Sequence, residues 1–367
     1  MAVQILFNCG IGDFVLSLPV VESIIREYSA KDSFFVYSGP PLSDFVKIWI
    51  NSRLFNSAVR WGISKRNCHL RIHFTREESC KIVSSRSLEC FFSVKKENGS
   101  IIKNQASLLR EWLGLKPAKP QALFSRARKL NWRIVCFGGA SAATRRLPLT
   151  TFTEFSRQIK QHLDFDSHLI LGPHEAELVP LNKNTFLCTD AQKALVHINK
   201  ADIAIGNDSG ICKFVRMCGC PTVSLYGPTD PTIWSLPNGI GAREEIIYHP
   251  PQQEYACTQC SALQAEQCIE QPCLSTISPA EIEHKIRKLL SMRIVPGATS
   301  YLIACTDCEM VGKGDTGYAV SRRLGIPLFF EKGFDMVQKV FERTIADSQI
   351  ERLLFEYGLF DLRRTVP

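Results

Sequence analysis

The chain has 367 residues, more than the ~250–300 at which one hydrophobic core stops growing, so two domains are expected. Hydrophobic residues make up 45% and charged residues 22% of it, which excludes a disordered or low-complexity chain. The net charge of +8 is dispersed, and no basic stripe alternates with aromatic side chains, so no nucleic-acid partner is expected.

The hydropathy pattern predicts a cytoplasmic protein. No apolar run reaches the ~18–20 residues that cross a bilayer, and the first seven residues lack the basic cluster of a signal peptide. Basic clusters occur at Lys65-Arg66, at Arg126, Arg128 and Lys129, and at Arg363-Arg364. They are consistent with peripheral contact to an anionic membrane surface, or with an ordinary solvated face.

The first part of the chain alternates between the two periodicities of an α/β fold. Residues 3–7 predict a strand, and residues 14–28 carry apolar side chains at the 3.6-residue spacing of a helix. Residues 34–37 and 70–74 predict further strands. We expect a parallel sheet here, in an N-terminal domain of residues 1–120 that ends in the proline-containing linker 115–120.

A second α/β series predicts a domain of residues 131–295. Its expected strands are 133–137, 168–171, 202–205 and 222–226. Capping boxes at Thr151/Glu154 and Ser278/Glu281 predict helices that end near residues 162 and 290.

Residues 296–367 predict an extension to these domains. Strands at 301–304 and 327–330 flank a helix-like stretch at 318–324, a βαβ-like pattern. The last ~35 residues predict amphipathic helices, which we expect to pack back on the N-terminal domain.

The first strand is followed by Gly10-x-Gly12-Asp13, at the carboxyl end of a sheet where ligands of α/β folds bind. Val15 stands where a dinucleotide motif needs its third glycine, which disfavours a nicotinamide fold. Asp13 falls in the first helical turn. Its carboxylate would either complement the helix dipole or take part in function.

Three more loops follow strands of the second series. Residues 206–213 place small residues and Lys213 at a helix start, where exposed N–H groups bind anions. Residues 226–232 form a proline-rich turn at the end of the neighbouring strand, and residues 138–148 add Arg145 and Arg146. Each loop alone is compatible with an ordinary helix cap, turn or basic surface; together they predict a phosphate pocket.

These motifs, in this order, resemble glycosyltransferase family 9, the ADP-heptose-using heptosyltransferases. They comprise Gly10-x-Gly12-Asp13 with Leu18-Pro19, Arg145-Arg146-Leu147-Pro148, Gly206-Asn-Asp-Ser-Gly210 and Gly227-Pro-Thr-Asp-Pro231. The resemblance spans roughly residues 1–290. It implies a GT-B fold: two Rossmann-like domains facing a central cleft, with the acceptor on the N-terminal side and the nucleotide-sugar on the other.

The resemblance also implies roles for individual residues. Asp13 matches the family's catalytic base, and Arg145 matches a basic residue on the donor phosphates. Gly12, Arg146, Asp208, Ser209, Gly210, Lys213 and Thr229 are the other expected donor-binding residues, with Glu175, or its rival Glu177, on the ribose hydroxyls. The implied mechanism needs no metal, because a helix terminus and cations stabilise the ADP leaving group.

The chain departs from the family at Lys213, where histidine is common. Lysine keeps its positive charge permanently, so phosphate binding is preserved, but a flat ring is replaced by a flexible stem. The identity of the donor sugar is therefore open.

Cysteines cluster in the loop 257–273, at Cys257, Cys260, Cys268 and Cys273, out of fifteen in the chain. A C-x-x-C pair with two further thiols suits a structural zinc or iron site. The second pair is spaced by four residues instead of two, so unligated thiols and disulfides stay as alternatives.

The resemblance predicts an inverting enzyme that moves heptose from ADP-heptose to a lipopolysaccharide-core acceptor, in the cytoplasm or at the inner face of the inner membrane. A protein serine or threonine is the alternative acceptor, which the cysteine loop suggests. A non-catalytic nucleotide- or metal-binding protein on the same fold is the alternative of another class.

Overall fold

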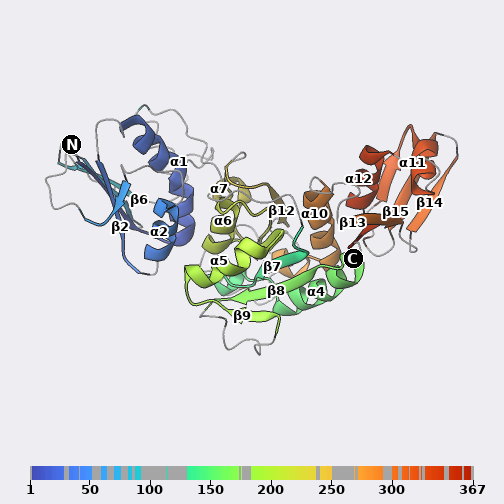
Figure 1. Cartoon of the computed structure of the whole chain (residues 1–367), viewed down its shortest axis with the longest axis horizontal. Coiled ribbons are helices and arrows are strands. Elements are labelled where there is room, and N and C mark those ends of the chain that lie inside the picture. The colour runs from blue at the N-terminus through green and yellow to red at the C-terminus, as the bar shows by residue number, and fades with distance from the viewer. Residues whose placement is uncertain are drawn as a thin grey trace.

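The computed structural model describes residues 2–28, 33–40, 42–51, 59–63, 70–75, 82–84, 87–91, 114, 130–172, 175, 183–236, 240–249, 268, 272–291, 300–304, 308–313, 315–321, 324, 327–342, 347–357 and 359–364. These residues form two α/β sheets and a C-terminal extension (Figure 1). None of the described helices is long and apolar enough to span a bilayer. The linker expected at residues 115–120 lies outside the described residues.

The N-terminal sheet has the order β3-β2-β1-β4-β6-β5. Its strands are β1 (Ala2–Asn8), β2 (Ser33–Ser38), β3 (Val59–Trp61), β4 (Leu70–Thr75), β5 (Ile82–Ser84) and β6 (Ser87–Phe91). All neighbours pair in parallel except β5, which is antiparallel to β6. Helices α1 (Ile11–Tyr28) and α2 (Ser43–Asn51) bury apolar side chains in the same core as β1. The predicted parallel sheet is confirmed.

The second sheet has the order β12-β11-β10-β7-β8-β9, with every pair parallel. Its strands are β7 (Arg133–Phe137), β8 (Asp166–Leu171), β9 (Thr185–Leu187), β10 (Ile203–Asn207), β11 (Thr222–Tyr226) and β12 (Glu244–Tyr248). This is the doubly wound order, whose direction reverses between β7 and β10. Ligands of such sheets bind outside the carboxyl ends at that reversal.

The helical segments of this domain are η1 (Ala143–Arg145), α4 (Leu149–Leu163), α5 (Ala191–Lys200), α6 (Gly210–Met217), α7 (Pro231–Trp234), α9 (Pro272–Ser275) and α10 (Pro279–Ser291). The predicted start of α10 is confirmed, because the Glu281 N–H donates to Ser278 Oγ at 3.2 Å. The predicted box at Thr151 is wrong. Helix α4 begins two residues earlier, because Leu149 packs against the same core as Phe152.

The extension consists of β13 (Ser300–Ala304), β14 (Cys308–Lys313), β15 (Thr316–Ser321), β16 (Pro327–Phe330), α11 (Phe334–Phe341), α12 (Ser348–Glu356) and β17 (Phe360–Arg364). The helix expected at 318–324 is wrong, since β14, β15 and β16 form an antiparallel sheet. Gly312 and Gly317 face each other there, and the Phe334 ring lies against both. A side chain at either glycine would collide with that ring.

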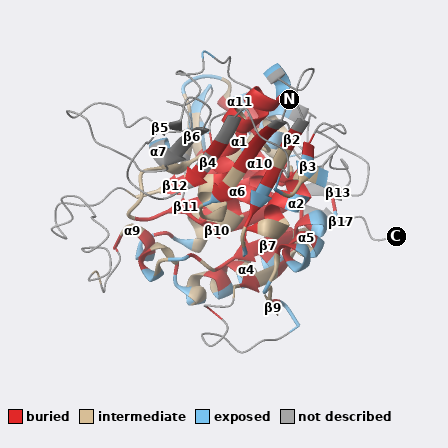
Figure 2. Cartoon of the chain, turned by 90° about the vertical axis from the view of Figure 1, so that its left-hand side faces the viewer, coloured by how far each residue is buried: buried red, intermediate tan, exposed pale blue. Residues whose placement is uncertain are grey.

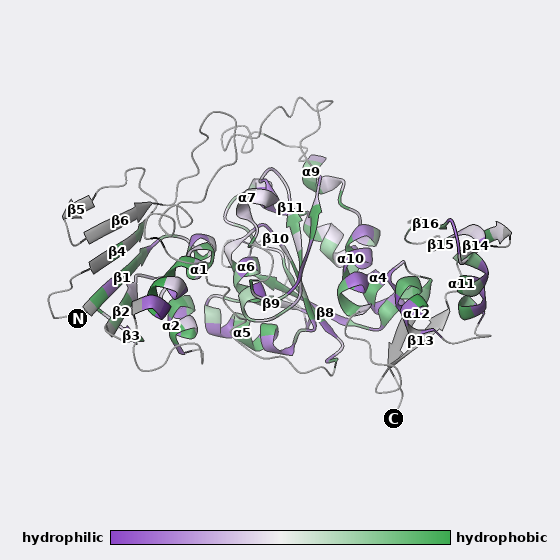
Figure 3. Cartoon of the chain, turned by 90° about the horizontal axis from the view of Figure 1, so that it is seen from above, coloured by the Kyte–Doolittle hydropathy of each residue, from purple (hydrophilic) through white to green (hydrophobic). Residues whose placement is uncertain are grey.

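The C-terminal helices do not return to the N-terminal domain, which corrects one part of the expected fold. Leu354 and Phe355 of α12 share a core with Ile282 and Ile286 of α10. Figures 1 and 3 place the extension and the N-terminal sheet at opposite ends of the molecule. The apolar side of α12 therefore packs against α10. The sequence predicted an apolar side but did not specify which element it packs against.

Candidate functional site

The site lies where the first turns of α1 and α6 meet. Helix α1 follows the carboxyl end of β1, and α6 follows that of β10. A Cβ atom placed on Gly210 would lie 2.5 Å from the backbone nitrogen of Gly12 and 2.8 Å from Cβ of Ile11. The two backbones are therefore in contact, and only glycine fits at position 210. Figure 2 shows α1 and α6 as adjacent, largely buried helices.

Both helix starts expose backbone N–H groups at this junction. Ser209 is the N-cap of α6, with its side chain accepting from the Cys212 N–H at 3.4 Å. Asp13 lies in the first turn of α1, and its Oδ2 accepts from the Gly10 N–H at 3.1 Å. Each helix start carries a partial positive charge, so the junction favours an anion.

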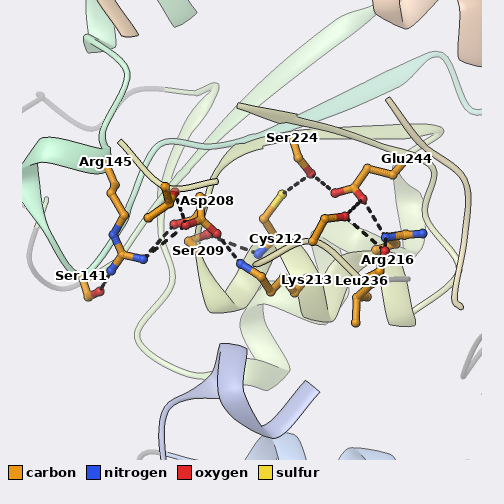
Figure 4. A network of polar contacts seen from close by, with 12 residues as sticks. Ser141, Arg145, Asp208, Ser209, Cys212, Lys213, Arg216, Ser224, Leu236 and Glu244 are labelled. Atoms are coloured by element: carbon orange, nitrogen blue, oxygen red, sulfur yellow. Dashed lines mark hydrogen bonds and ion pairs between the residues drawn. The ribbon is translucent and has the colours of Figure 1, made fainter. Parts of the chain in front are cut away.

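Asp208, which is 3% exposed, holds the loop before α6 through three side chains. Lys213 Nζ bonds to Asp208 Oδ1, Thr229 Oγ1 donates to Oδ2 at 2.7 Å, and Arg145 Nη1 lies 3.5 Å from Oδ2 (Figure 4). The predicted neighbourhood of the 206–210 and 227–229 turns is thus present. Asp208 brings both turns and the Arg145 loop together.

The charges around Asp208 do not cancel. Burial opposes ionisation of Asp208, but Lys213, Thr229 and Arg145 together hold its pKa below the ordinary value. One carboxylate is then shared by two cations, which leaves one positive charge beside two helix starts. Lys213 also reaches the N-terminal domain, because its Cδ lies 3.8 Å from a Cβ placed on Gly12.

Arg146 and Glu175 form a second ion pair beside this cluster. Arg146 Nη2 lies 3.0 Å from Glu175 Oε1, and the Gly172 N–H donates to Glu175 Oε2 at 3.0 Å. Glu175 is 3% exposed, and a Cβ on Gly139 would lie 2.6 Å from Oε2. Both carboxylate oxygens are thus engaged in fixing the Gly139 loop. Glu177, the rival ribose ligand, lies outside the described residues.

The sequence did not single out Asn207 as a positioning residue. Its buried side chain accepts from the Leu147 N–H at 2.9 Å and donates to the Gly138 carbonyl at 2.8 Å. It therefore joins the ends of β7 and β10, across the reversal in strand order. An asparagine before Asp-Ser-Gly reads as an ordinary turn residue, so no sequence signal identified it.

The cysteine loop is only partly described. Cys257 and Cys260 lie outside the described residues, whereas Cys268 and Cys273 are partly buried. Within the described part of the chain, no three His, Cys, Asp or Glu side chains are grouped to hold a metal ion.

Comparison with known proteins shows which family this arrangement resembles. The family model described as glycosyltransferase family 9 (heptosyltransferase) matches residues 106–269. This match covers a little under half of the chain and includes the loops at residues 138–148, 206–213 and 226–232. The resemblance inferred from the motifs is confirmed, and the protein is a glycosyltransferase. No curated protein matches the chain significantly.

Solved structures extend the comparison to the fold of this glycosyltransferase. Escherichia coli heptosyltransferase WaaC with ADP shares 13% identity, covers 79% of this chain and 100% of its own, and superposes with a TM-score of 0.51. Escherichia coli ADP-heptose lipopolysaccharide heptosyltransferase II shares 13%, covers 80% and 99%, and has a TM-score of 0.50. At these identities the likeness shows the fold, and the expected GT-B architecture is confirmed.

A third solved structure contains a metal. TibC from enterotoxigenic Escherichia coli, an iron-containing dodecameric glycosyltransferase, shares 13% identity, covers 80% of this chain and 76% of its own, and has a TM-score of 0.51. The iron is a property of TibC. It makes the metal content of the present protein a direct question.

Proposed function

We propose that the enzyme transfers heptose from ADP-heptose to a lipopolysaccharide-core acceptor, with inversion at the anomeric carbon. The convergence of α1, which carries Asp13, with the Asp208–Lys213 cluster of the other domain carries this proposal. It puts a candidate base and a positively charged anion site on opposite sides of one junction. Solved relatives with ADP and with an ADP-heptose analogue support the choice of donor.

In this mechanism the donor diphosphate lies against the first turn of α6. The N–H groups at Ser209 and Gly210, together with Lys213 and Arg145, stabilise the charge that grows on ADP as the glycosidic bond breaks. Thr229 keeps Asp208 oriented toward Lys213, so that the cations are held in place before the reaction. These groups supply the leaving-group stabilisation without a catalytic metal.

Asp13 acts on the other substrate. Its carboxylate accepts the proton of the acceptor hydroxyl while that oxygen attacks the anomeric carbon, opposite the departing diphosphate. The new bond forms on the face away from ADP, and the electron pair of the broken bond leaves with ADP. The Gly10 N–H holds one carboxylate oxygen of Asp13 at the start of α1.

Three further assignments belong to the same proposal. Arg146 and Glu175 shape the loop on the nucleotide side, and the ribose hydroxyls of the donor lie beside the Glu175 carboxylate. The cysteine loop, including Cys268 and Cys273, holds a structural zinc or iron ion. The enzyme works in the cytoplasm, in peripheral contact with the inner face of the inner membrane.

The test is Asp13→Asn, assayed for transfer from ADP-heptose and for ADP binding. We expect kcat to fall by about 10²–10⁴-fold, because the amide cannot accept the proton, with little change in ADP affinity. Asp44→Asn is the matched control, since Asp44 lies in the first turn of α2 and its pairing with Lys47 is exposed. It should keep wild-type rates.

Two acceptors are supplied in parallel, a heptose-deficient lipopolysaccharide core and an acceptor protein rich in serine and threonine. Transfer to the core supports the proposal. Transfer to the protein alone would mean that the acceptor is a protein and not the lipopolysaccharide core. If wild-type enzyme transfers to neither, or if Asp13→Asn keeps the wild-type rate, the proposed mechanism is wrong.

A further inference from the structure

Two loops, residues 208–210 and 227–229, surround the proposed donor site, and we call them the donor loops. A buried polar network lies beneath them, on the side of the sheet that carries α6. We call it the Glu244 network; it comprises Cys212, Arg216, Ser224, Ser235 and Glu244 (Figure 4). None of these residues was predicted to contact substrate. The Arg216 and Glu244 side chains are 3% and 8% exposed, so the pair is shielded from solvent.

Glu244 of β12 is the hub of this network. Arg216 Nη1 donates to its Oε2 at 2.7 Å, Ser235 Oγ donates to the same oxygen at 2.5 Å, and Ser224 Oγ donates to Oε1 at 2.5 Å. The carboxylate thus receives bonds from three separate elements. Removing one partner from a buried set like this leaves polar atoms without compensation.

Each residue that bonds to Glu244 lies on an element next to a donor loop. Arg216 lies on α6, whose first turn holds Ser209 and Gly210. Ser224 lies on β11, two residues before Tyr226, where the 227–229 turn begins, and its Oγ contacts Cys212 Sγ on α6 at 3.7 Å. Ser235 ends α7, the helix that starts directly after that turn. Glu244 therefore ties both loops to one point.

Arg216 extends the network to the segment before β12. Its Nε donates to the Ala242 carbonyl at 2.8 Å and its Nη1 to the Leu236 carbonyl at 2.9 Å. Gly241 has φ +67°, and a Cβ there would lie 2.8 Å from the Arg216 carbonyl oxygen. This close turn leaves α6 little room to shift along its axis.

We propose that Glu244 is a positioning residue for donor binding: it fixes the spacing between the 208–210 and 227–229 loops without touching the donor. This inference rests on the proposed donor site. Preorganised loops bind a ligand more tightly because less ordering is needed on binding. Glu244 thus affects donor affinity through the geometry of loops that it does not belong to.

The test compares Glu244→Gln with Glu245→Gln. Glu245 is the next residue of β12, and its side chain is 9% exposed against 8% for Glu244. It pairs with Arg243, Lys285 and Lys288, away from the donor loops. Isothermal titration calorimetry with ADP gives affinity and stoichiometry separately. We expect about tenfold weaker binding in Glu244→Gln at unchanged stoichiometry, and a matching rise in the KM for ADP-heptose with kcat nearly unchanged. Glu245→Gln should bind as wild type.

A purely structural role gives a different pattern. It would reduce the stoichiometry or kcat and leave the dissociation constant unchanged, or would affect both glutamate variants alike; either result overturns the proposal. If Glu244→Gln does not fold, Ser235→Ala removes a single bond to the hub and should weaken ADP binding in the same direction. Wild-type ADP affinity in that variant also overturns the proposal.

Hydrogen exchange separates this inference from the proposed function. In protein without nucleotide, Glu244→Gln should speed exchange of the amides of residues 209–213 and 226–229, and leave β7 and β8 unchanged. If wild-type protein binds no ADP, the proposed function fails, and exchange still decides the role of Glu244. Unchanged exchange in these two loops contradicts it.

Discussion

At the residue scale, Gly210 and Lys213 decide the character of the site. Gly210 allows the backbone of α6 to touch that of α1, because any side chain would meet the nitrogen of Gly12. Lys213 bonds to Asp208 and so places its ammonium group beside that contact.

Glu22 gives a prediction at the same scale. It is 6% exposed between α1 and α2, with Trp49 Nε1 donating to its Oε1 at 3.3 Å. Burial raises its pKa from 4.5 to about 7, with Trp49 and Arg26 opposing the rise. Because the folded protein holds this proton more tightly than the unfolded chain, stability is lost as pH rises from about 4.5 through 7.

Glu22→Gln removes the cost of ionising a buried carboxyl group, since the glutamine side chain stays neutral. We expect the free energy of unfolding in urea to match wild type near pH 4.5 and to exceed it by roughly 3 kcal/mol at pH 8. Glu27→Gln, on the exposed side of the same helix, is the control and should show no pH-dependent gain. If Glu22→Gln and wild type differ in unfolding free energy by the same amount at both pH values, this account is wrong.

At the element scale, α10 fastens the extension to the second domain. Arg287 is fully buried, bonds to Glu283 Oε1 through Nε and Nη2, and donates through Nη1 to the carbonyls of Phe355 and Phe360. His162 of α4 bonds to the other Glu283 oxygen at 2.6 Å. Burial opposes ionisation of Glu283, but Arg287 and His162 hold its pKa below the ordinary value.

Arg287→Met tests this attachment. It leaves the Glu283 carboxylate and two carbonyls without the guanidinium, so we expect a loss of about 3–5 kcal/mol in unfolding free energy. Limited proteolysis should also cut the extension first. Lys288→Met is the control on the same helix; its pairing with Glu245 is partly exposed and should cost less than about 1 kcal/mol. Equal losses in the two variants would show that Arg287 is not the fastening residue.

At the scale of the whole molecule, two sheets face each other through the α1–α6 junction, and the extension lies on the far side of the second sheet. The Phe45 and Phe214 rings add an edge-to-face contact across this junction, 4.8 Å between centroids. The junction combines an apolar contact with two helix starts. It therefore holds the two domains together.

The metal content is a property of the intact chain. Protein purified without chelator should carry about one equivalent of zinc or iron, measured by elemental analysis. Cys268→Ser should abolish it, because a tetrahedral thiolate site loses a ligand, whereas Cys188→Ser, outside the loop, should not. If wild-type protein carries less than about a tenth of an equivalent of zinc or iron, the proposed metal site is wrong.

The sequence by itself determined the features encoded within a few residues. Alternating periodicities placed three strands of the first sheet (β1, β2 and β4) and four of the second (β7, β8, β10 and β11). Ser278 and Glu281 marked the start of α10, and small residues after β1, β7, β10 and β11 marked the loops that carry the site. Periodicity and turn chemistry are local, so they can be read without knowing what each element packs against.

Only the tertiary structure decided which elements meet. The contact between Gly12 and Gly210, the pairing of Glu175 with Arg146, the Glu244 hub and the docking of α12 on α10 each join segments far apart in the chain. An apolar face or a lone carboxylate specifies that it needs a partner but not which partner. That choice depends on the packing of all elements together.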